Sequence, residues 1–554
     1  MQRRRRPRRP GGQGLVVCQP AAGRSAVHRG RGRDLRGVAN VRRRPEPPGP
    51  RHRGGLSRRH LLLGLPAVGV VVAFARHEVH RTVNVRHHGA KGDGVTDDSA
   101  AIQRAAASLR PNSTLYFPRG SYRFADRTTR SGAAVVIAGL DKVTVEFAPD
   151  AELVMDNLDP AARTGTSHGI LVHGPAADVE LRNVTIRWSQ PATRSMGDGI
   201  RVVGDPFSRW WHRGPVNRVT LSHCSIQGSP QAGVIMIGTS DIRIAGLRSE
   251  NTRADGLHFN GCRRARIDDY TAVDAGDDGL ALVTYYGPAK LVDADAQTFS
   301  FPDLTEWSNG DFAVSNVSIK GGRANGVRLA GARGVTLTGL AVAGVDSGAA
   351  VMIDSAGPDN DVGWHYVASR GVRVVDLAVD SCETGIHVLA RPDDKIDRRF
   401  TDFDVTVEDA AIRDCTNWSV RAESLTAQRI TGFELRSCTV EASSSTGGNG
   451  GVGLANTTHS RLESVSIRHS KAVLAFAATE VGDLAAEQLA VTITDGDPPA
   501  EPGPCTGFEN CDGVVDGLRM AWDAAPATWS PLQLIDDAAD VRQSTRRRLT
   551  IRTL

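Results

Sequence analysis

A short phrase that recurs along the chain constrains its fold more than any other feature. The phrase is a glycine, an apolar residue, any residue and a second apolar residue, and its copies begin at Gly199, Gly233, Gly256, Gly279, Gly326 and Gly385. The copies at Gly233, Gly256 and Gly279 are 23 residues apart, and a second short alternating phrase lies between them. Short strands of period two at a fixed interval are typical of a solenoid. The sequence therefore predicts an all-β fold, a right-handed parallel β-helix. A β-sandwich is the main alternative, but it would not keep this phase.

The charges are divided unevenly along the 554 residues. The net charge is +5, yet residues 1–60 hold 18 arginines and two acids, so the rest of the chain is net negative, at −11. We expect the arginine-rich segment 1–56 to be disordered or, if the start codon lies downstream, not translated. The basic residues lie outside the predicted fold, which predicts no nucleic-acid partner.

An export signal is expected at residues 57–75. Arg58 and Arg59 precede an uncharged run, Leu61–Ala75, that ends in an A-x-A pattern and is short for a membrane span. The segment resembles a twin-arginine signal peptide. An uncleaved anchor is the alternative. We expect a mature chain that begins near Arg76, is exported, and keeps no stable membrane insertion.

The cysteines predict neither a disulfide framework nor a zinc site. Seven remain after the predicted signal, which is an odd number, and none has zinc-ligand spacing. Cys505 and Cys511 flank a short loop and could pair. We expect a monomer without metal or cofactor.

The N-terminal end of the predicted solenoid carries two motifs, GAKGDGVTDD at residues 89–98 and YFPRGSY at 116–122. They resemble the opening of the pectate-lyase-like β-helix superfamily, which implies a helix that plugs the first coil. Asp93, Asp97 and Asp98 could be interpreted as a calcium loop or a catalytic cluster. We interpret them, with Thr96, as caps of a helix over residues 99–109. The predicted domains are an N-terminal cap at 76–135, a catalytic β-helix at 136–495, and a C-terminal cap or tail at 496–554.

Three aspartates form the strongest candidate site. Asp255 and Asp278 each directly precede a repeated glycine and lie 23 residues apart, so they should stack one coil above the other, with Asp277 adjacent. Carboxylates this close repel, which drives their pKa values apart and allows one acid and one base at the same pH.

The motifs around these aspartates resemble glycoside hydrolase family 28, the polygalacturonases and their relatives. The resemblance implies that Asp277 is the general acid and that Asp255 and Asp278 activate water for inverting hydrolysis of a polysaccharide or oligosaccharide. Two departures bear on the substrate. Asn325 stands where the family has a histidine, and Met352-Ile353-Asp354 stands where it has the R-I-K motif that grips a uronate. We therefore predict a neutral or differently charged glycan rather than polygalacturonate.

Further residues are candidates for contact with the glycan. Asn251, His258 and Arg328 lie in or beside the same motifs, and Trp211, Tyr285 and Tyr286 lie on insertions between coils. The predicted substrate-binding residues are Asn251, His258, Asn325, Arg328, Tyr285, Tyr286 and Trp211.

Two other functions remain open on the sequence. One is a polysaccharide lyase or epimerase in which the aspartates hold Ca²⁺ and Arg323 or Arg328 takes the proton. The other is a non-catalytic, glycan-binding β-helix.

Overall fold

The computed structural model describes residues 80–553, apart from 130, 206–213, 286–291, 294–297, 300–307, 358–364, 392–396, 445–449 and 537–548. The predicted head and signal, 1–75, lie outside the described residues, as do Trp211 and Tyr286. Residues from Val79 onward form one compact unit.

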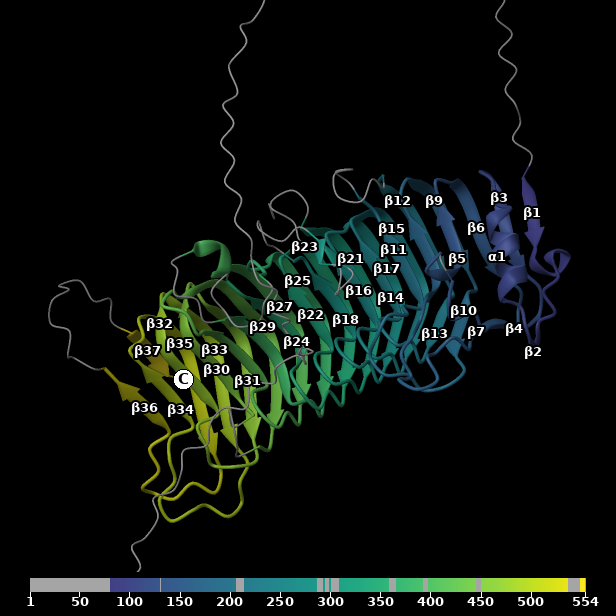
Figure 1. The fold of residues 1–554 in the computed structure, drawn as a ribbon. Coiled ribbons are helices and arrows are strands. Elements are labelled where there is room, and N and C mark those ends of the chain that lie inside the picture. The colour runs from purple at the N-terminus through teal and green to yellow at the C-terminus, as the bar shows by residue number, and fades with distance from the viewer. Residues whose placement is uncertain are drawn as a thin grey trace, which may run out of the picture. The chain divides into compact units, whose positions relative to one another are not determined.

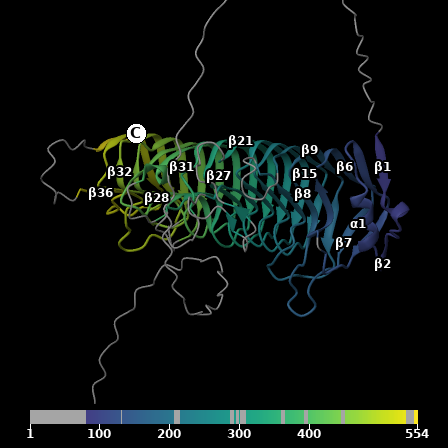
Figure 2. The same cartoon turned by 45° about the horizontal axis from the view of Figure 1, so that its top comes forward.

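The described chain is a right-handed parallel β-helix, which confirms the predicted fold. Its strands stack coil upon coil from β1 to β37, and Figures 1 and 2 show the coils following one another along a single axis. Every pairing between neighbouring coils is parallel, and the pairings fall into three ladders.

The first ladder carries the candidate site. Its strands are β5 (Ala133–Ala138), β8 (His168–His173), β11 (Ile200–Val203), β14 (Val234–Ile237), β16 (Leu257–Asn260), β18 (Leu280–Val283), β22 (Val327–Ala330), β24 (Ala349–Ser355), β26 (Thr384–Ala390), β28 (Val420–Ser424), β30 (Val452–Thr458), β32 (Phe476–Gly482), β34 (Thr506–Glu509) and β36 (Leu532–Ile535).

The second ladder forms most of the opposite wall. Its strands are β1 (Arg81–Asn84), β3 (Ser113–Phe117), β6 (Asp141–Phe147), β9 (Ala176–Arg182), β12 (Val216–Ser222), β15 (Thr239–Glu250), β17 (Arg263–Val273), β21 (Asn309–Lys320), β23 (Ala332–Ala343), β25 (Arg370–Asp380), β27 (Asp402–Arg413), β29 (Ile430–Ala442), β31 (Arg461–His469), β33 (Leu484–Ile493), β35 (Gly513–Trp522) and β37 (Leu549–Thr553).

The third ladder is short and merges with the second. It contains β2 (Asp93–Asp97), β4 (Gly120–Phe124), β7 (Ala151–Met155), β10 (Thr185–Trp188) and β13 (Ser225–Gln227). The long strand β15 pairs with β12 of the second ladder and with β13 of the third, so the two ladders become one from this coil onward. Between β18 and β21, β19 (Val292–Asp293) and β20 (Thr298–Phe299) form a small antiparallel pair.

The long strands bend at one stacked position. Asp269 in β17 and Asn316 in β21 have φ values of 54° and 55°, and the matching residue of β23 is Gly339 at 65°. Aspartate, asparagine and glycine are the residues that adopt this left-handed conformation most readily. The pair Asp268-Asp269 therefore marks the bend of a coil.

The repeated glycine marks a close approach between coils. A Cβ on Gly256 would lie 2.3 Å from the Tyr270 hydroxyl and 2.7 Å from the Gly279 carbonyl oxygen. A Cβ on Gly279 would meet the Gly326 carbonyl oxygen at 2.7 Å. The phrase recurs because any side chain at this position would push neighbouring coils apart.

The first coil is plugged by helix α1 (Ser99–Ala107), preceded by the short 3₁₀ helix η1 (Val85–His88); a second, η2 (Arg398–Phe400), precedes β27. The buried side of α1 includes Ala101, Ile102 and Ala105, which pack against the core. The helix therefore covers the first core layer, as a solenoid requires.

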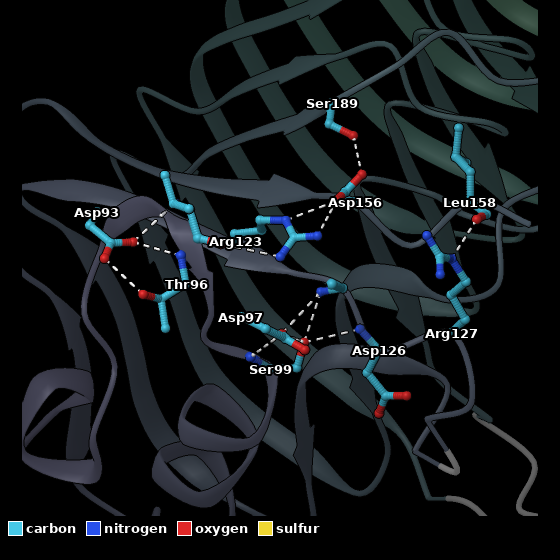
Figure 3. A network of polar contacts seen from close by, with 12 residues as sticks. Asp93, Thr96, Asp97, Ser99, Arg123, Asp126, Arg127, Asp156, Leu158 and Ser189 are labelled. Atoms are coloured by element: carbon cyan, nitrogen blue, oxygen red, sulfur yellow. Dashed lines mark hydrogen bonds and ion pairs between the residues drawn. The ribbon is translucent and has the colours of Figure 1, made fainter. Parts of the chain in front are cut away.

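Of the residues predicted to cap α1, only Asp97 accepts a helical N–H among the described hydrogen bonds. Thr96 does not cap the helix, because its N–H and hydroxyl both donate to Asp93, at 2.7 Å (Figure 3). Asp98 instead accepts the backbone N–H groups of Lys91 and Gly92. Of the three, Asp97 accepts the first helical N–H, from Ser99, at 3.0 Å. These aspartates fix the loop.

A neighbouring network joins the cap to the first coils. Figure 3 shows Arg123 of β4 donating to Asp156, which also accepts from the Ser189 hydroxyl. Asp156 lies after β7 and Ser189 after β10, so the contacts link three successive coils.

The core is one continuous apolar column that runs from Val83 to Trp522. Cys505 and Cys511 do not pair; all seven described cysteines are free thiols and six of them are buried. Burial raises the pKa of the Cys224, Cys262, Cys415 and Cys438 thiols to about 12, so these cysteines are inert packing residues.

Candidate active site

Asp255 and Asp278 belong to a longer row of polar residues on the first ladder, and Asp277 lies directly beside it. Each member stands two residues before strand positions that are paired in register: Leu257 with Leu280, and Leu280 with Val327. A side-chain oxygen of each polar member accepts the N–H of the residue one coil further on. The distances are 3.0 Å for Asp198 to Ala232, 3.1 Å for Asp255 to Asp278, 3.2 Å for Asp278 to Asn325, and 2.9 Å for Asn325 to Ala349. We call these residues the polar row.

The row brings Asp255, Asp277 and Asp278 together, as the 23-residue spacing predicts. One oxygen of each carboxylate lies within 4.8 Å of one oxygen of each of the others. Asp278 is only 3% exposed, whereas the side chains of Asp255 and Asp277 are 14% and 27% exposed. Of the three, Asp277 is therefore the carboxyl group most open to a ligand.

The surroundings drive the three pKa values apart. Burial, together with the charge of Asp255, raises the pKa of Asp277 against the opposing effect of Arg194. Burial and the charge of Asp277 raise the pKa of Asp278 well above its usual range. Burial also acts on Asp255, but the charge and hydrogen bond of His258 outweigh it and lower the pKa of Asp255. An ionised Asp255 therefore lies beside two carboxyl groups that retain protons to higher pH.

Arg194 is a site residue that the sequence reasoning missed. It lies between β10 and β11, three coils before Asp277, and its Nη2 lies 2.7 Å from Asp277 Oδ2. The arginine has no place in the repeated phrase, so no periodic signal could have identified it. Its guanidinium partly offsets the negative charge of the aspartates.

His258, a predicted glycan-contact residue two positions beyond Gly256, lies in contact with Asp255. Its Nδ1 lies 2.8 Å from Asp255 Oδ2, and the Tyr285 ring stacks on the imidazole at 6.1 Å between centroids. His258 Nε2 is buried and has no hydrogen-bond partner within the described part of the chain. Buried polar atoms are nearly always paired, so an orphan of this kind at a site indicates a place for a water or ligand atom.

Two arginines converge on Asp354, and the charge of one of them, Arg328, also acts on Asp277 and Asp278. Arg328 donates two hydrogen bonds to Asp354, at 3.0 and 2.8 Å, and Arg391 donates to the same carboxylate. The Tyr366 ring lies under Arg328, 5.1 Å from its Cζ. Met352 and Asp354 supply no cation, as the sequence indicates, but Arg328 and Arg391 come from neighbouring coils. This cluster carries one net positive charge.

The other predicted residues divide into two groups. Asn325 joins the site, because its side-chain amide donates to Asp278 at 2.8 Å. Asn251 does not: it is exposed at the end of β15 with φ 52°, and none of the described contacts joins it to the aspartates. Trp211 and Tyr286 lie outside the described residues.

Within the described residues, no helix has both the length and the apolar character needed to cross a bilayer.

Comparison with known proteins gives a family and several distant similarities. The sequence model of the family described as "Rhamnogalacturonase A/epimerase, pectate lyase-like" matches residues 82–390. Alginate lyase 7 of Azotobacter vinelandii is 29% identical over 127 residues, which are 21% of this chain and 14% of that protein. Mannuronan C5-epimerase AlgE1 of the same organism is 38% identical over 74 residues, 12% of this chain and 5% of that protein. The chain thus spans a small part of these curated relatives.

One solved structure in the comparison is a family 28 exopolygalacturonase from Yersinia enterocolitica. It has 12% sequence identity and a TM-score of 0.44, and the match covers 76% of this chain and 79% of that one.

Proposed function

Because the chain belongs to the rhamnogalacturonase A/epimerase, pectate lyase-like family, we propose that it acts on a glycan and that it hydrolyses glycosidic bonds. One observation carries the proposal: three carboxyl groups on adjacent coils have pKa values shifted in opposite directions. Paired groups of this kind can serve as an acid and a base at one pH.

In the proposed reaction Asp277 is the general acid. Its raised pKa keeps the proton, and its partial exposure gives the glycan access to it. Asp277 protonates the leaving glycosidic oxygen as the bond to the anomeric carbon breaks, and water attacks that carbon. Of Asp255 and Asp278, the pKa directions favour Asp255 as the group that takes the proton of water, because Asp255 is ionised. The proton then returns to Asp277 through solvent.

Inversion at the anomeric carbon is part of the proposal and rests on the family 28 resemblance alone. The closest carboxyl oxygens lie within 4.8 Å, which is shorter than the roughly 6.5–9.5 Å between carboxyl groups in typical inverting enzymes. Proton NMR of the first product anomer tests this point directly. An initial product of retained configuration would remove inversion from the mechanism.

We propose a substrate other than polygalacturonate. The positions matched to the R-I-K motif are occupied by Met352 and by Asp354, which carries a negative charge. The net positive charge of the Arg328–Asp354–Arg391 cluster nevertheless makes other acidic glycans a class to be tested beside neutral ones.

A lyase or epimerase is the second candidate, and a specific observation favours it. The imidazole of His258 is held by Asp255 through Nδ1, and in its neutral form, with the proton on Nδ1, its Nε2 can accept a proton. Removal of the proton next to a uronate carboxylate is the step that starts either reaction. The names of two relatives, an alginate lyase and a mannuronan epimerase, point to the same chemistry.

Incubation with a panel of neutral and acidic glycans distinguishes these functions. Hydrolysis gives new reducing ends without ultraviolet absorbance, and it persists in chelator. A lyase gives unsaturated, absorbing ends, and an epimerase changes the sugar NMR spectrum without cleavage. Unsaturated ends or uncleaved epimerised product would contradict hydrolysis. Binding without any reaction would leave a glycan-binding protein.

A further inference from the structure

Further along the solenoid, the face that carries the aspartates has a second cluster of polar groups, to which the proposed reaction assigns no role. We propose that Trp418 and Arg421 form a binding subsite for a distant sugar unit of an oligosaccharide whose other end lies at the aspartates. This inference rests on the proposed glycan-directed function, and it adds the direction in which the glycan lies.

The new subsite lies on the same row as the aspartates. Strand positions Leu280, Val327, Val351, Ile386 and Val420 are aligned in register from coil to coil. Asp278 stands two residues before the first of them, and Trp418 stands two residues before the last. Four coil steps separate the two residues, which is about 19 Å at the usual strand spacing. An oligosaccharide of several units can span that distance.

The outward-facing positions of the same strands also form a row in register. Its members are His258, Ala281, Arg328, Met352, His387, Arg421 and Gly453. Arg328, His387 and Arg421 of this row are partly exposed, whereas His258, Ala281 and Met352 are buried. A glycan that lies along the row would therefore meet exposed hydrogen-bonding side chains on three of these coils.

The subsite itself is held rigidly by ion pairs. Arg421 donates to Glu423 Oε2 at 3.1 and 2.9 Å, and His387 Nε2 lies 3.0 Å from Glu423 Oε1. These partners outweigh the burial of Glu423 and lower its pKa to about 2, so it stays ionised. The side chains of Arg421, Glu423 and His387 are each 18% exposed. Their fixed positions reduce the entropy lost when a ligand binds.

The guanidinium of Arg421 lies over the Trp418 ring. The Arg421 Cζ is 4.9 Å from the centre of the Trp418 ring. A Cβ on Gly453, the next residue of the outward row, would meet Arg421 Nη1 at 2.6 Å and Trp418 Cζ3 at 2.9 Å. Both side chains therefore lie over the space that a larger residue at 453 would fill. Arg421 Nη1 has no hydrogen-bond partner among the described residues, so it can donate to a sugar hydroxyl, while an aromatic ring packs against the sugar's apolar face.

On the other side of the aspartates the outward positions Ile235, Arg201 and Leu171 are buried. Ala281 and Met352 are equally buried downstream, so the two directions differ in the segment that crosses the face, not in the exposure of these strand residues. The segment between β10 and β11 crosses these coils, because Ser195 bonds Pro230 and Arg194 reaches Asp277. The glycan therefore extends from the aspartates toward β28.

Titration calorimetry with the Asp277→Asn protein, chosen to prevent cleavage, tests the inference. The probes are oligogalacturonates, oligomannuronates and α-1,3-linked gluco-oligosaccharides, each from disaccharide to octasaccharide. We expect affinity to rise with chain length for at least one series. Adding Trp418→Ala should weaken the octasaccharide about tenfold and leave the disaccharide within about twofold. Trp418→Phe, which keeps an aromatic ring, should restore most of the loss.

Arg421→Gln is the second variant, and it should also weaken the octasaccharide alone. Its matched control is Arg373→Gln, because Arg373 is ion-paired with Glu408 at 2.6 Å and lies on the second ladder, away from both rows. Equal loss for disaccharide and octasaccharide, or equal loss in the control, would overturn the subsite. Binding without any dependence on length overturns this inference alone. Failure of every probe to bind overturns the glycan-directed function as well.

Discussion

At the scale of single residues, what could be predicted depended on whether a residue follows the repeat. Asp255, Asp278, Asn325 and His258 occupy fixed offsets from the repeated glycine, so counting along the sequence places them on one face. Arg194 reaches the site from a segment outside the phase, and no count could assign it. The charge balance of the site was therefore the part that sequence alone could not supply.

Replacing the proposed acid is the most direct test at this scale. Asp277→Asn removes the transferable proton and should lower kcat about a hundredfold to ten-thousandfold on any cleaved glycan. The circular dichroism spectrum and the unfolding midpoint should stay near those of the parent protein. Asp269→Asn is the control, because Asp269 is exposed at a bend whose left-handed conformation asparagine also adopts. Near-normal turnover in Asp277→Asn would remove this residue from the mechanism.

Arg194 should set the alkaline limit of activity. The reaction needs Asp277 protonated, so activity is present below the raised pKa of Asp277 and is lost as pH rises through it. The Arg194 guanidinium holds that pKa down, and Arg194→Gln should therefore move the alkaline limb of the kcat/KM profile to higher pH.

The control for Arg194 is Arg218→Gln. Arg218 is 54% exposed and 2.7 Å from its carboxylate, as Arg194 is, but its partner is Asp178, outside the site. The role assigned to Arg194 would be contradicted if the alkaline limb of the kcat/KM profile did not shift in Arg194→Gln, or if it shifted equally in both variants.

At the scale of elements, the polar row and the repeated glycine explain why the coils keep their register. Each polar side chain of the row satisfies a backbone N–H of the next coil, and each glycine allows that coil to approach closely. The 23-residue phase reveals both features in the sequence. The bend of the long strands was not predicted, since aspartate, asparagine, serine and glycine share that position without a common motif.

Asp198 should stabilise its coil through burial rather than chemistry. It is fully buried and bonds Arg201, at 2.8 Å, and the Ala232 N–H. Asp198→Ala removes the carboxylate that these two groups bond. It should lower the free energy of unfolding, measured with denaturant, by about 3–5 kcal/mol. Asp178→Asn, which removes the charge of an exposed pair with Arg218 and suits the left-handed backbone at this position (φ 55°), should cost about 1 kcal/mol or less. Similar costs for both variants would refute the argument.

The same residue predicts acid sensitivity. Despite burial, hydrogen bonds and charges from His168 and Arg201 lower the pKa of Asp198 to about 2 from 3.8. A lowered pKa gives stability that is present above 3.8 and is lost as pH falls from there through about 2, on the order of 2 kcal/mol. Denaturant midpoints measured across that window should fall less steeply in Asp198→Asn than in the parent protein.

The close approach at Gly279 can be tested with one methyl group. Gly279→Ala places a Cβ against the Gly326 carbonyl oxygen and the Ile319 side chain, and it should destabilise the protein by about 1–3 kcal/mol. Gly496→Ala is the control, because nothing lies within 4 Å of a Cβ there. Equal unfolding midpoints for the two variants would show that the repeated glycine is not needed for packing.

At the scale of the whole molecule, the fold was predictable because a solenoid repeats the same short strands and turns in coil after coil. If one coil is misassigned, the spacing of the other coils is unchanged. Short strands at a constant interval were therefore enough to identify the architecture. The substrate was not predictable in the same way, because insertions between coils and charges from neighbouring coils shape the surface that meets it.

We propose that the chain is exported and works as a monomer, and processing tests the first point. N-terminal sequencing of secreted protein should give a start near Arg76. Replacing Arg58 and Arg59 with lysines should retain the chain in the cytoplasm, whereas lysine at Arg51 and Arg53 should not. Export that is unaffected by the first change would exclude the twin-arginine route.

The polar row also bears on how such a site arises. Its acids hold adjacent coils together whether or not any reaction takes place. Asp198 is an example, because its buried carboxylate bonds groups of the protein itself. A neighbouring carboxylate such as Asp277 then needs only one substitution to appear beside an acid that the scaffold already retains. Catalysis on this fold can thus be gained or lost by point changes along a row whose architecture persists, which makes the same coils a common starting point for different chemistries.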